Sequence, residues 1–326
     1  MRRLSRNRGP DSAWPWTMTR NVTKGMDSEG YIVPSKISSV AFVGLGIMGS
    51  HMARHLLEAG YSLHVSTKTP GKAEPLLARG AVWHDNAADA AAVAEAVITM
   101  VGSPTDIESL YFGANGILNS AAAGTVLIDM TTSSPTLAIR IHQSAAEKGL
   151  LSLDAPVSGG EAGARDATLT IMAGGEEATF RLVEPLFRRL GSKITLAGAA
   201  GAGQSTKLCN QIVMAGAIAG VAEGLTYAKR AGLDLAQTLQ TLSSGAARSF
   251  QLEMLGPRML ANDFAPGFMV QHILKDLSIA AIEAAEHRLD LKMLNVVREQ
   301  FAVLADNGGA RDGMQAIFRC YDTPVP

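Results

Sequence analysis

Cysteine, aromatic residues and excess charge are all scarce in this 326-residue chain. The two cysteines, Cys209 and Cys320, form no Cys-x-x-Cys pair, which argues against a disulfide framework or a zinc site and is typical of a reducing compartment. Lysine and arginine number 29 against 30 acidic residues, so the chain has no general attraction to nucleic acid or to anionic membranes. We therefore expect a cytoplasmic protein with no metal site, no nucleic-acid partner and no membrane partner.

Long apolar runs are also missing. Residues 212–221 come nearest, but Gly216 and Gly220 interrupt them and Glu223 follows, so no run reaches the roughly 18 residues of a membrane helix. Residues 1–36 carry four arginines before the first acid but lack the apolar stretch of a secretory signal. A transit peptide is an alternative interpretation, which the acidic residues further along weaken. We expect these residues to be a disordered extension.

Residues 37–200 alternate between short apolar runs and helical patterns. Residues 40–43 form a continuous apolar run, as in a strand buried on both faces. A helix with Met48, Met52 and Leu56 at spacing four follows it and ends at Gly60. A second helix is predicted over 72–79, and further strands over 61–65, 96–101, 125–130, 151–154, 168–172 and 193–196. This alternation predicts an α/β fold with a doubly wound parallel sheet.

The pattern after residue 200 is helical only. Residues 204–230 lack proline and predict one long helix, and shorter helices are predicted over 234–242, 251–260, 273–286 and 294–306. We therefore place a domain boundary near residue 200, with an all-α domain over 201–326 that opens with an interdomain helix. Gly216, Gly220 and Gly224 form a stripe of small residues that favours close domain or subunit packing.

A Gly-x-Gly-x-x-Gly motif lies directly between the first predicted strand and the first predicted helix. Such glycines let the backbone approach a pyrophosphate, which then binds at the helix N-terminus. Glycine-rich turns also occur for structural reasons, but this position favours a dinucleotide site. The motif makes 37–200 a Rossmann-type domain whose cofactor-binding residues are Gly44, Gly46, Ile47, Met48 and Gly49.

The end of the second predicted strand bears on which dinucleotide binds. Enzymes that use NAD usually carry an acid there, whereas this chain has Thr67 and Lys68 and no acid before Glu74. Hydroxyls and a lysine would favour a 2′-phosphate that a carboxylate would repel. NADP(H) is therefore favoured over NAD(H). The alternative is that Lys68 and Lys72 are ordinary surface lysines.

Two further segments carry chemistry. Ser158, Gly159 and Gly160 end a strand with a hydroxyl and successive N–H groups that could hold a substrate carboxylate, although a structural turn is the alternative. Near the start of the long helix, Lys207 lies on one face with Asn210 and Gln211. Burial would lower the pKa of this lysine and make it a general acid–base group, with the amides holding the substrate oxygen. Spacing alone favours this interpretation no more than the alternative that Lys207 is an ordinary solvated lysine.

Five segments together resemble the β-hydroxyacid dehydrogenases, the family that includes 3-hydroxyisobutyrate dehydrogenase, tartronate semialdehyde reductase and 6-phosphogluconate dehydrogenase. They are GLGIMG, DMTTSSP (129–135), DAPVSGG (154–160), GAGQSTKLCNQ (201–211) and FAPGFMVQHILKDL (264–277), and the resemblance covers roughly residues 37–320. It implies a cofactor domain joined by a long helix to a helical domain, in homodimers or homotetramers, acting on a small carboxylic acid.

The resemblance also assigns residues. It places the catalytic lysine on Lys207 and the substrate-binding serine and glycines on Ser158, Gly159 and Gly160. It lines the cofactor with Val101, Gly102 and Thr132, and it implies that Lys275 reaches the cofactor from the helical domain. Thr67-Lys68-Thr69 stands where NADP-preferring members often have Asn-Arg-Thr, and a lysine cannot grip a phosphate bidentately, which implies a moderate preference.

Departures from the family pattern bear on the substrate. Thr131 replaces a usual serine, and the Asn210–Gln211 pair is more similar to tartronate semialdehyde reductases than to hydroxyisobutyrate enzymes. We expect an NADP(H)-dependent reductase of 2-hydroxy-3-oxopropionate, with a 3-hydroxyisobutyrate dehydrogenase-like enzyme as the alternative. An imine reductase or a non-catalytic NADPH-binding scaffold is disfavoured because Lys207 is present. Arg248, Phe250 and Phe268 are candidates for choosing the substrate.

Overall fold

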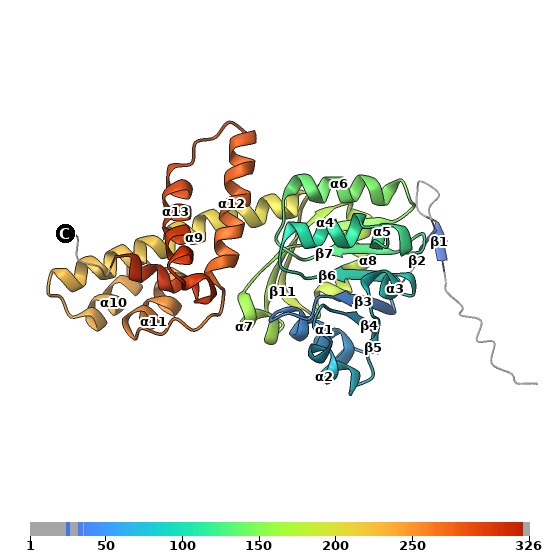
Figure 1. Ribbon diagram of the computed structural model, residues 1–326, viewed down its shortest axis with the longest axis horizontal. Coiled ribbons are helices and arrows are strands. Elements are labelled where there is room, and N and C mark those ends of the chain that lie inside the picture. Colours follow the sequence, from blue (N-terminus) through green and yellow to red (C-terminus); the bar gives the residue numbers. More distant parts are fainter. Residues whose placement is uncertain (1–23, 27–31, 35, 322–326) are drawn as a thin grey trace, which may run out of the picture.

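The computed structural model describes residues 24–26, 32–34 and 36–321, which form an α/β domain and a helical domain (Figure 1). Strand β11 (Gly191–Gly198) is the last element of the first domain. Helix α9 (Ala202–Arg230) begins beside it and runs the length of the second domain (Figure 1). The predicted fold class, a Rossmann-type sheet followed by an all-α domain, is confirmed.

Two short strands lie in the segment that was expected to be disordered. β1 (Lys24–Met26) pairs in antiparallel register with β2 (Ile32–Pro34). The β-branched residues Ile32 and Val33 favour this extended backbone. Residues 1–23, 27–31 and 35 lie outside the described residues, and for them disorder stays a prediction.

The main sheet has nine strands in the order β11-β10-β8-β7-β6-β3-β4-β5, with β9 pairing only with β10. Six strands run parallel: β3 (Ser39–Val43), β4 (Ser62–Ser66), β5 (Val82–Trp83), β6 (Ala96–Thr99), β7 (Val126–Asp129) and β8 (Leu151–Asp154). β10 (Leu169–Gly175) runs antiparallel to β8 and to β9 (Val157–Ser158) and parallel to β11. The sheet is therefore mostly parallel, as predicted, and it departs from the parallel pattern where β10 pairs with β8 and β9. The connection from β9 to β10 is too short for the crossover that a parallel strand needs.

Apolar side chains fill both faces of the sheet. Val40 and Phe42 of β3 pack into one core cluster, and Ala41 and Val43 into another. Burial on both faces explains the continuous apolar run. The covering helices are α1 (Gly49–Glu58), α2 (Glu74–Leu77), α3 (Ala87–Ala92), α4 (Pro104–Phe112), α5 (Ile117–Ser120), α6 (Pro135–Ala146), α7 (Gly160–Arg165) and α8 (Glu177–Phe187). The helix predicted over 72–79 is instead the turn η1 (Pro70–Lys72) followed by α2.

The helical domain packs around α9. Its other elements are α10 (Leu235–Ser243), the π-helical turn η2 (Gln251–Leu255), α11 (Gly256–Leu260), α12 (Val270–Glu286), α13 (Lys292–Asp306), η3 (Gly309–Arg311) and η4 (Met314–Cys320). By length and hydropathy alone, α9 could cross a membrane. Its buried residues Ile218, Ala222 and Leu225, however, share a core with Ile273 of α12 and Phe301 of α13. α9 is therefore packed as the core helix of this domain.

Candidate active site

The glycine-rich loop connects β3 to α1 without room for side chains at two of its glycines. Gly44 has a φ of +101°, and a Cβ on it would lie 2.3 Å from the carbonyl oxygen of Met100. A Cβ on Gly49 would lie 2.0 Å from the carbonyl oxygen of Gly44. These close approaches let α1 begin directly at the end of the strand, as the motif predicts.

The remaining motif glycine, Gly46, faces open space that could hold a bound dinucleotide. A Cβ on Gly46 would meet no atom within 4 Å. Within the described residues, the backbone N–H groups of Ile47 and Met48 donate no hydrogen bond, and α1 has no acid in its first turn. The side chain of Ile47 is 47% exposed beside this space. Free N–H groups at a helix N-terminus are the donors that a pyrophosphate needs.

The end of β4 is tied to the glycine-rich loop, and Lys68 lies just beyond it. The Leu45 N–H donates to Thr67 Oγ1 at 3.3 Å, and the Gly44 N–H donates to Ser66 O at 2.9 Å. The Lys68 side chain is 86% exposed, and its Nζ lies 2.5 Å from Asp106 Oδ1. This contact lowers the pKa of Asp106. Any 2′-phosphate must therefore share Lys68 with a carboxylate that sequence analysis did not identify.

Asp106 had a recognisable signal in the sequence. Ser103 caps α4 by accepting a hydrogen bond from the Asp106 N–H at 3.2 Å, and its own hydroxyl donates to Asp106 Oδ2 at 2.8 Å. A serine followed three residues later by an acid is a helix-start pattern. The spacing predicts the cap, but only the tertiary structure brings Asp106 to Lys68.

The loops after β6 and β7 lie side by side, with Val101 and Gly102 in one and Thr132 in the other. The Val101 N–H donates to Thr131 Oγ1 at 3.0 Å, and the Thr131 N–H donates to Asp129 Oδ1 at 3.0 Å. Burial raises the pKa of Asp129 to about 6. The threonine that departs from the family pattern thus uses its hydroxyl to join the two predicted cofactor loops.

Buried polar groups fix the start of α9. The Asp154 carboxylate accepts hydrogen bonds from the backbone N–H groups of Gly201 at 2.7 Å and Gln204 at 2.8 Å. The Gln204 side chain donates to Thr131 O at 2.8 Å and accepts from the Ser133 N–H at 2.9 Å. Burial raises the pKa of Asp154, and its helix-terminal N–H partners oppose that shift. Asp154 and Gln204 were not predicted as site residues, although both lie inside quoted motifs.

Lys207 follows one turn later and is buried at the junction of the domains. Its residue is 6% exposed. Burial lowers its pKa from 10.5 to about 8; nearby Lys275 acts in the same direction, and Asp276 opposes the shift. Its Nζ makes no hydrogen bond or ion pair with any other described residue. The solvated-lysine alternative is therefore excluded, and a lysine with this pKa can exchange a proton near neutral pH.

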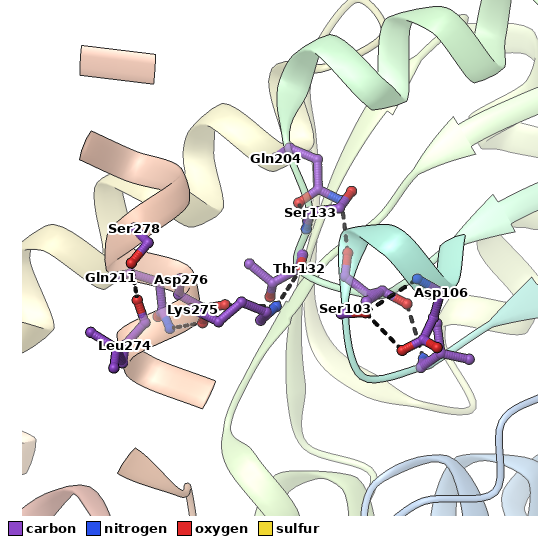
Figure 2. Close-up of polar contacts among 12 residues, drawn as sticks. Ser103, Asp106, Thr132, Ser133, Gln204, Gln211, Leu274, Lys275, Asp276 and Ser278 are labelled. Carbon is purple, nitrogen blue, oxygen red and sulfur yellow. Dashed lines mark hydrogen bonds and ion pairs between the residues drawn. The ribbon is translucent and has the colours of Figure 1, made fainter. Parts of the chain in front are cut away.

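Gln211 lies one turn further along the same face and holds Asp276. Its Nε2 donates to Asp276 Oδ2 at 2.5 Å (Figure 2). Its Oε1 accepts a hydrogen bond from Asn210 Nδ2 at 2.8 Å. Gln211 and Asp276 are fully or nearly fully buried, whereas Asn210 is half-buried. The Gln211 amide is thus engaged within the protein, while Asn210 keeps its oxygen free among the described residues. Asp276 was not predicted as a site residue, although it lies in the quoted segment FAPGFMVQHILKDL.

Lys275 joins the two domains. Its Nζ donates to Thr132 O at 2.6 Å and lies 2.9 Å from Asp276 Oδ1 (Figure 2). This contact places Lys275 against one of the predicted cofactor loops.

The Ser158–Gly160 segment forms the predicted turn at the end of β9. Gly159 and Gly160 have φ values of +133° and +62°, and α7 begins at Gly160. The Ser158 side chain is half-buried and makes no hydrogen bond within the described residues. A Cβ on Gly160 would lie 3.8 Å from the carbonyl oxygen of Gly267, so the helical domain comes close to this turn. The backbone is open to an anion, as a nest requires.

Comparisons with known proteins agree with this geometry. Residues 39–198 match the model described as the NAD binding domain of 6-phosphogluconate dehydrogenase. Residues 201–321 match the model described as NAD-binding of NADP-dependent 3-hydroxyisobutyrate dehydrogenase. The chain belongs to the β-hydroxyacid dehydrogenase family. The family assignment makes it an NAD(P)-dependent oxidoreductase of the 3-hydroxyisobutyrate dehydrogenase and tartronate semialdehyde reductase type.

Individual relatives cover nearly the whole described chain. An uncharacterized oxidoreductase of Bacillus subtilis is 45% identical over 87% of this chain and 98% of its own length. A 2-hydroxy-3-oxopropionate reductase of Escherichia coli is 42% identical over 83% of this chain and 93% of its own. Among solved structures, a 3-hydroxyisobutyrate dehydrogenase of Mycobacterium tuberculosis with L-serine has a TM-score of 0.82 at 31% identity, covering 88% of this chain and 100% of that one.

Proposed function

We propose that this dehydrogenase is an NADP(H)-dependent reductase of a short semialdehyde acid, with 2-hydroxy-3-oxopropionate as its substrate. The observation that carries the proposal is Lys207, a buried lysine with a pKa of about 8 that no other described side chain holds by a hydrogen bond. The reductase of Escherichia coli that is 42% identical supports this substrate class.

The residues of the chain divide the chemistry between them. NADPH, held by the glycine-rich loop, would supply the hydride that reduces the carbonyl carbon. Lys207 Nζ donates a proton to the carbonyl oxygen, since a carbonyl that gains a hydride must also gain a proton. The Ser158 hydroxyl and the N–H groups of Gly159 and Gly160 bind the carboxylate. Asn210 binds the substrate oxygen, and Gln211 acts through Asp276 rather than on the substrate.

The preference for NADP(H) rests on the end of β4. Thr67 and Lys68 offer a hydroxyl and a cation where NAD enzymes carry an acid. Because Lys68 is paired with Asp106, a 2′-phosphate must compete with that carboxylate for the ammonium group. We therefore propose a preference that is real but smaller than an unpaired cation would give.

A 3-hydroxyisobutyrate dehydrogenase-like activity is the second candidate, and the solved Mycobacterium tuberculosis enzyme favours it. An imine reductase or a cofactor-binding scaffold has less support, because a buried lysine with a lowered pKa serves neither role. The two hydroxy-acid activities differ in the substituent on the substrate's second carbon and are separated by assay.

The test is NADPH consumption with 2-hydroxy-3-oxopropionate, for wild type and for Lys207→Met, with NADH as the second cofactor. We expect NADPH-linked turnover that falls by about 10²- to 10⁴-fold in the variant, the usual contribution of a general acid. Turnover of the 2-methyl analogue in preference to the hydroxyl substrate would establish the second candidate. Full activity in Lys207→Met would refute the proton-donor role, and preference for NADH would refute the NADP assignment.

Homo-oligomer formation is a further part of the proposal. Two of the three glycines of the predicted stripe have no neighbour among the described residues, since a Cβ on Gly220 or Gly224 would meet no atom within 4 Å, whereas one on Gly216 would lie 3.5 Å from Met293. Large apolar residues on the same domain are exposed, among them Tyr227 and Ile282 at 74% and 61%. Such a surface supports self-association. Light scattering after gel filtration should give at least twice the mass of the 34.2 kDa chain.

A further inference from the structure

An open hollow lies along α9 beside the face that carries Lys207. Its volume is about 390 Å³, and it is lined by Cys209, Asn210, Val213, Met214 and Gln251. Asn210 and Met214 follow Lys207 by three and seven residues, so they lie on the same side of the helix as the lysine. The hollow therefore adjoins the catalytic face and extends from it toward η2.

Gln251 is an unpaired amide in this hollow. The residue is 9% exposed, and its side chain makes no hydrogen bond with any described residue. It begins the π-helical turn η2, a kind of turn that occurs frequently at functional sites. The amide atoms of Gln251 are not sealed from solvent, so they can form hydrogen bonds with a ligand or with water in the hollow.

Asn210 gives the hollow a second amide with free hydrogen-bonding capacity. One of its N–H groups is used by Gln211 Oε1, and its Oδ1 accepts nothing from the described residues. The other lining side chains are a thiol and two apolar groups, and none of the five is charged. The hollow thus fits an uncharged polar group and would leave a second carboxylate without a counter-charge.

We propose that Gln251, with Asn210, forms the subsite that recognises an uncharged polar substituent, such as a hydroxyl, on the second carbon of the substrate. Gln251 would then be the residue that selects 2-hydroxy acids over 2-methyl acids. The inference rests on the proposed function, because it places this carbon beside the carbonyl that Lys207 protonates. A hydroxyl satisfies both amides, whereas a methyl group would leave them unpaired. A site built this way discriminates strongly against the analogue that lacks the hydroxyl.

The kinetic test compares two aldehydes that differ only in this substituent, 2-hydroxy-3-oxopropionate and 2-methyl-3-oxopropionate. Their ratio of kcat/KM values is measured for wild type, for Gln251→Leu, which keeps the bulk and removes the amide, and for Met254→Leu. Met254 is 55% exposed on the same turn and serves as the matched control. We expect the ratio to fall by about tenfold or more in Gln251→Leu and to stay unchanged in the control. An unchanged ratio in Gln251→Leu would overturn the proposal.

A binding test does not depend on turnover. Cys209 lines the hollow and is exposed, so its alkylation by iodoacetamide reports occupancy, with half-buried Cys320 as the internal reference for folding. In the presence of NADP⁺, glycerate should protect Cys209 more strongly than 3-hydroxyisobutyrate does, and Gln251→Leu should abolish that difference. Equal protection by the two acids in wild type would overturn the subsite.

The two tests separate the subsite from the proposed function. A wild type that reduces neither aldehyde would refute the proposed function. Selective protection of Cys209 by glycerate would still support the subsite in that case. Faster alkylation of Cys320 in Gln251→Leu would reveal that this variant is misfolded, and Gln251→Asn would then be tested in its place. We expect Gln251→Asn to lose part of the substrate selectivity, and full selectivity in that variant would overturn the proposal.

Discussion

Lys207→Met is expected to stabilise the folded chain while it removes the proton donor. Burial lowers the pKa of Lys207 from 10.5 to about 8. The charged side chain therefore costs the folded state about 3 kcal/mol, since each pKa unit corresponds to about 1.4 kcal/mol. Methionine keeps most of the buried aliphatic volume and has no charge to desolvate. At pH 7 we expect the variant to be more stable by up to about 3 kcal/mol.

The stability difference between Lys207→Met and wild type should depend on pH. Below pH 8 the lysine is protonated in both the folded and the unfolded chain, so the whole cost is present. Between pH 8 and 10.5 the folded chain has lost its proton and the unfolded chain has not, so the stability of the wild type rises with pH. Above pH 10.5 both states are neutral and the advantage of the variant disappears.

Urea unfolding without cofactor, at pH 7 and at pH 9.5, measures the effect. Lys193→Met is the control, because Lys193 is exposed on β11 and its replacement should shift stability little at either pH. A Lys207→Met chain that is less stable than wild type at pH 7, or whose advantage does not shrink at pH 9.5, would refute the account of a desolvated lysine.

If Lys207 donates the proton as proposed, the same pKa sets the pH dependence of the reaction. Reduction requires the protonated lysine, so kcat/KM for the aldehyde should fall as pH rises through about 8, and the reverse oxidation should rise through the same range. A profile measured in both directions, with no inflection near pH 8 in either, would show that another group moves the proton.

Three further predictions follow from contacts at the cofactor site and around the catalytic lysine. Lys68→Ala should raise the KM for NADPH about tenfold and leave the KM for NADH nearly unchanged. Asp106→Asn should lower the KM for NADPH, because it removes the competing carboxylate. Steady-state kinetics with both cofactors checks both expectations. Gly46→Val should weaken binding of either cofactor without lowering the melting temperature. Gly49→Val, which clashes with backbone, should destabilise the chain by about 2 kcal/mol or more. Fluorescence titration measures the loss of cofactor binding, and thermal unfolding measures the loss of stability. Asp276→Asn should move the pH profile of reduction to lower pH, because it removes a charge that favours the protonated lysine; the shift is read from kcat/KM against pH.

Much of the fold could be predicted because it depends on local pattern. Residues 40–43 are apolar on both faces because they form a central strand, and the long run without proline after residue 200 became α9. The antiparallel β10 could not be predicted, because strand direction depends on a connection whose path a local pattern does not encode. The helix expected over 251–260 contains a π-helical turn, which has no periodic signature of its own.

In the candidate site, too, the residues that depend on local pattern could be predicted, and those that depend on tertiary contacts could not. Lys207 and the three motif glycines could be identified because their chemistry is tied to residue type and spacing. The partners of Gln211 and Lys68 could not, because Asp276 lies 65 residues from the first and Asp106 lies 38 residues from the second. Each acid is ordinary in its own segment and gains its role only from the tertiary contact.

Those contacts explain how Lys207, the proposed proton donor, is held. Asp154 of the α/β domain binds the backbone of α9 at Gln204, and Asp276 of the helical domain binds Gln211. Lys207 stands between these two points on a rigid helix, so each domain fixes one side of it. The Lys275–Thr132 hydrogen bond is different, because it spans the two domains without passing through α9. Loss of the Lys275–Thr132 contact alone would therefore leave both ties on α9 in place.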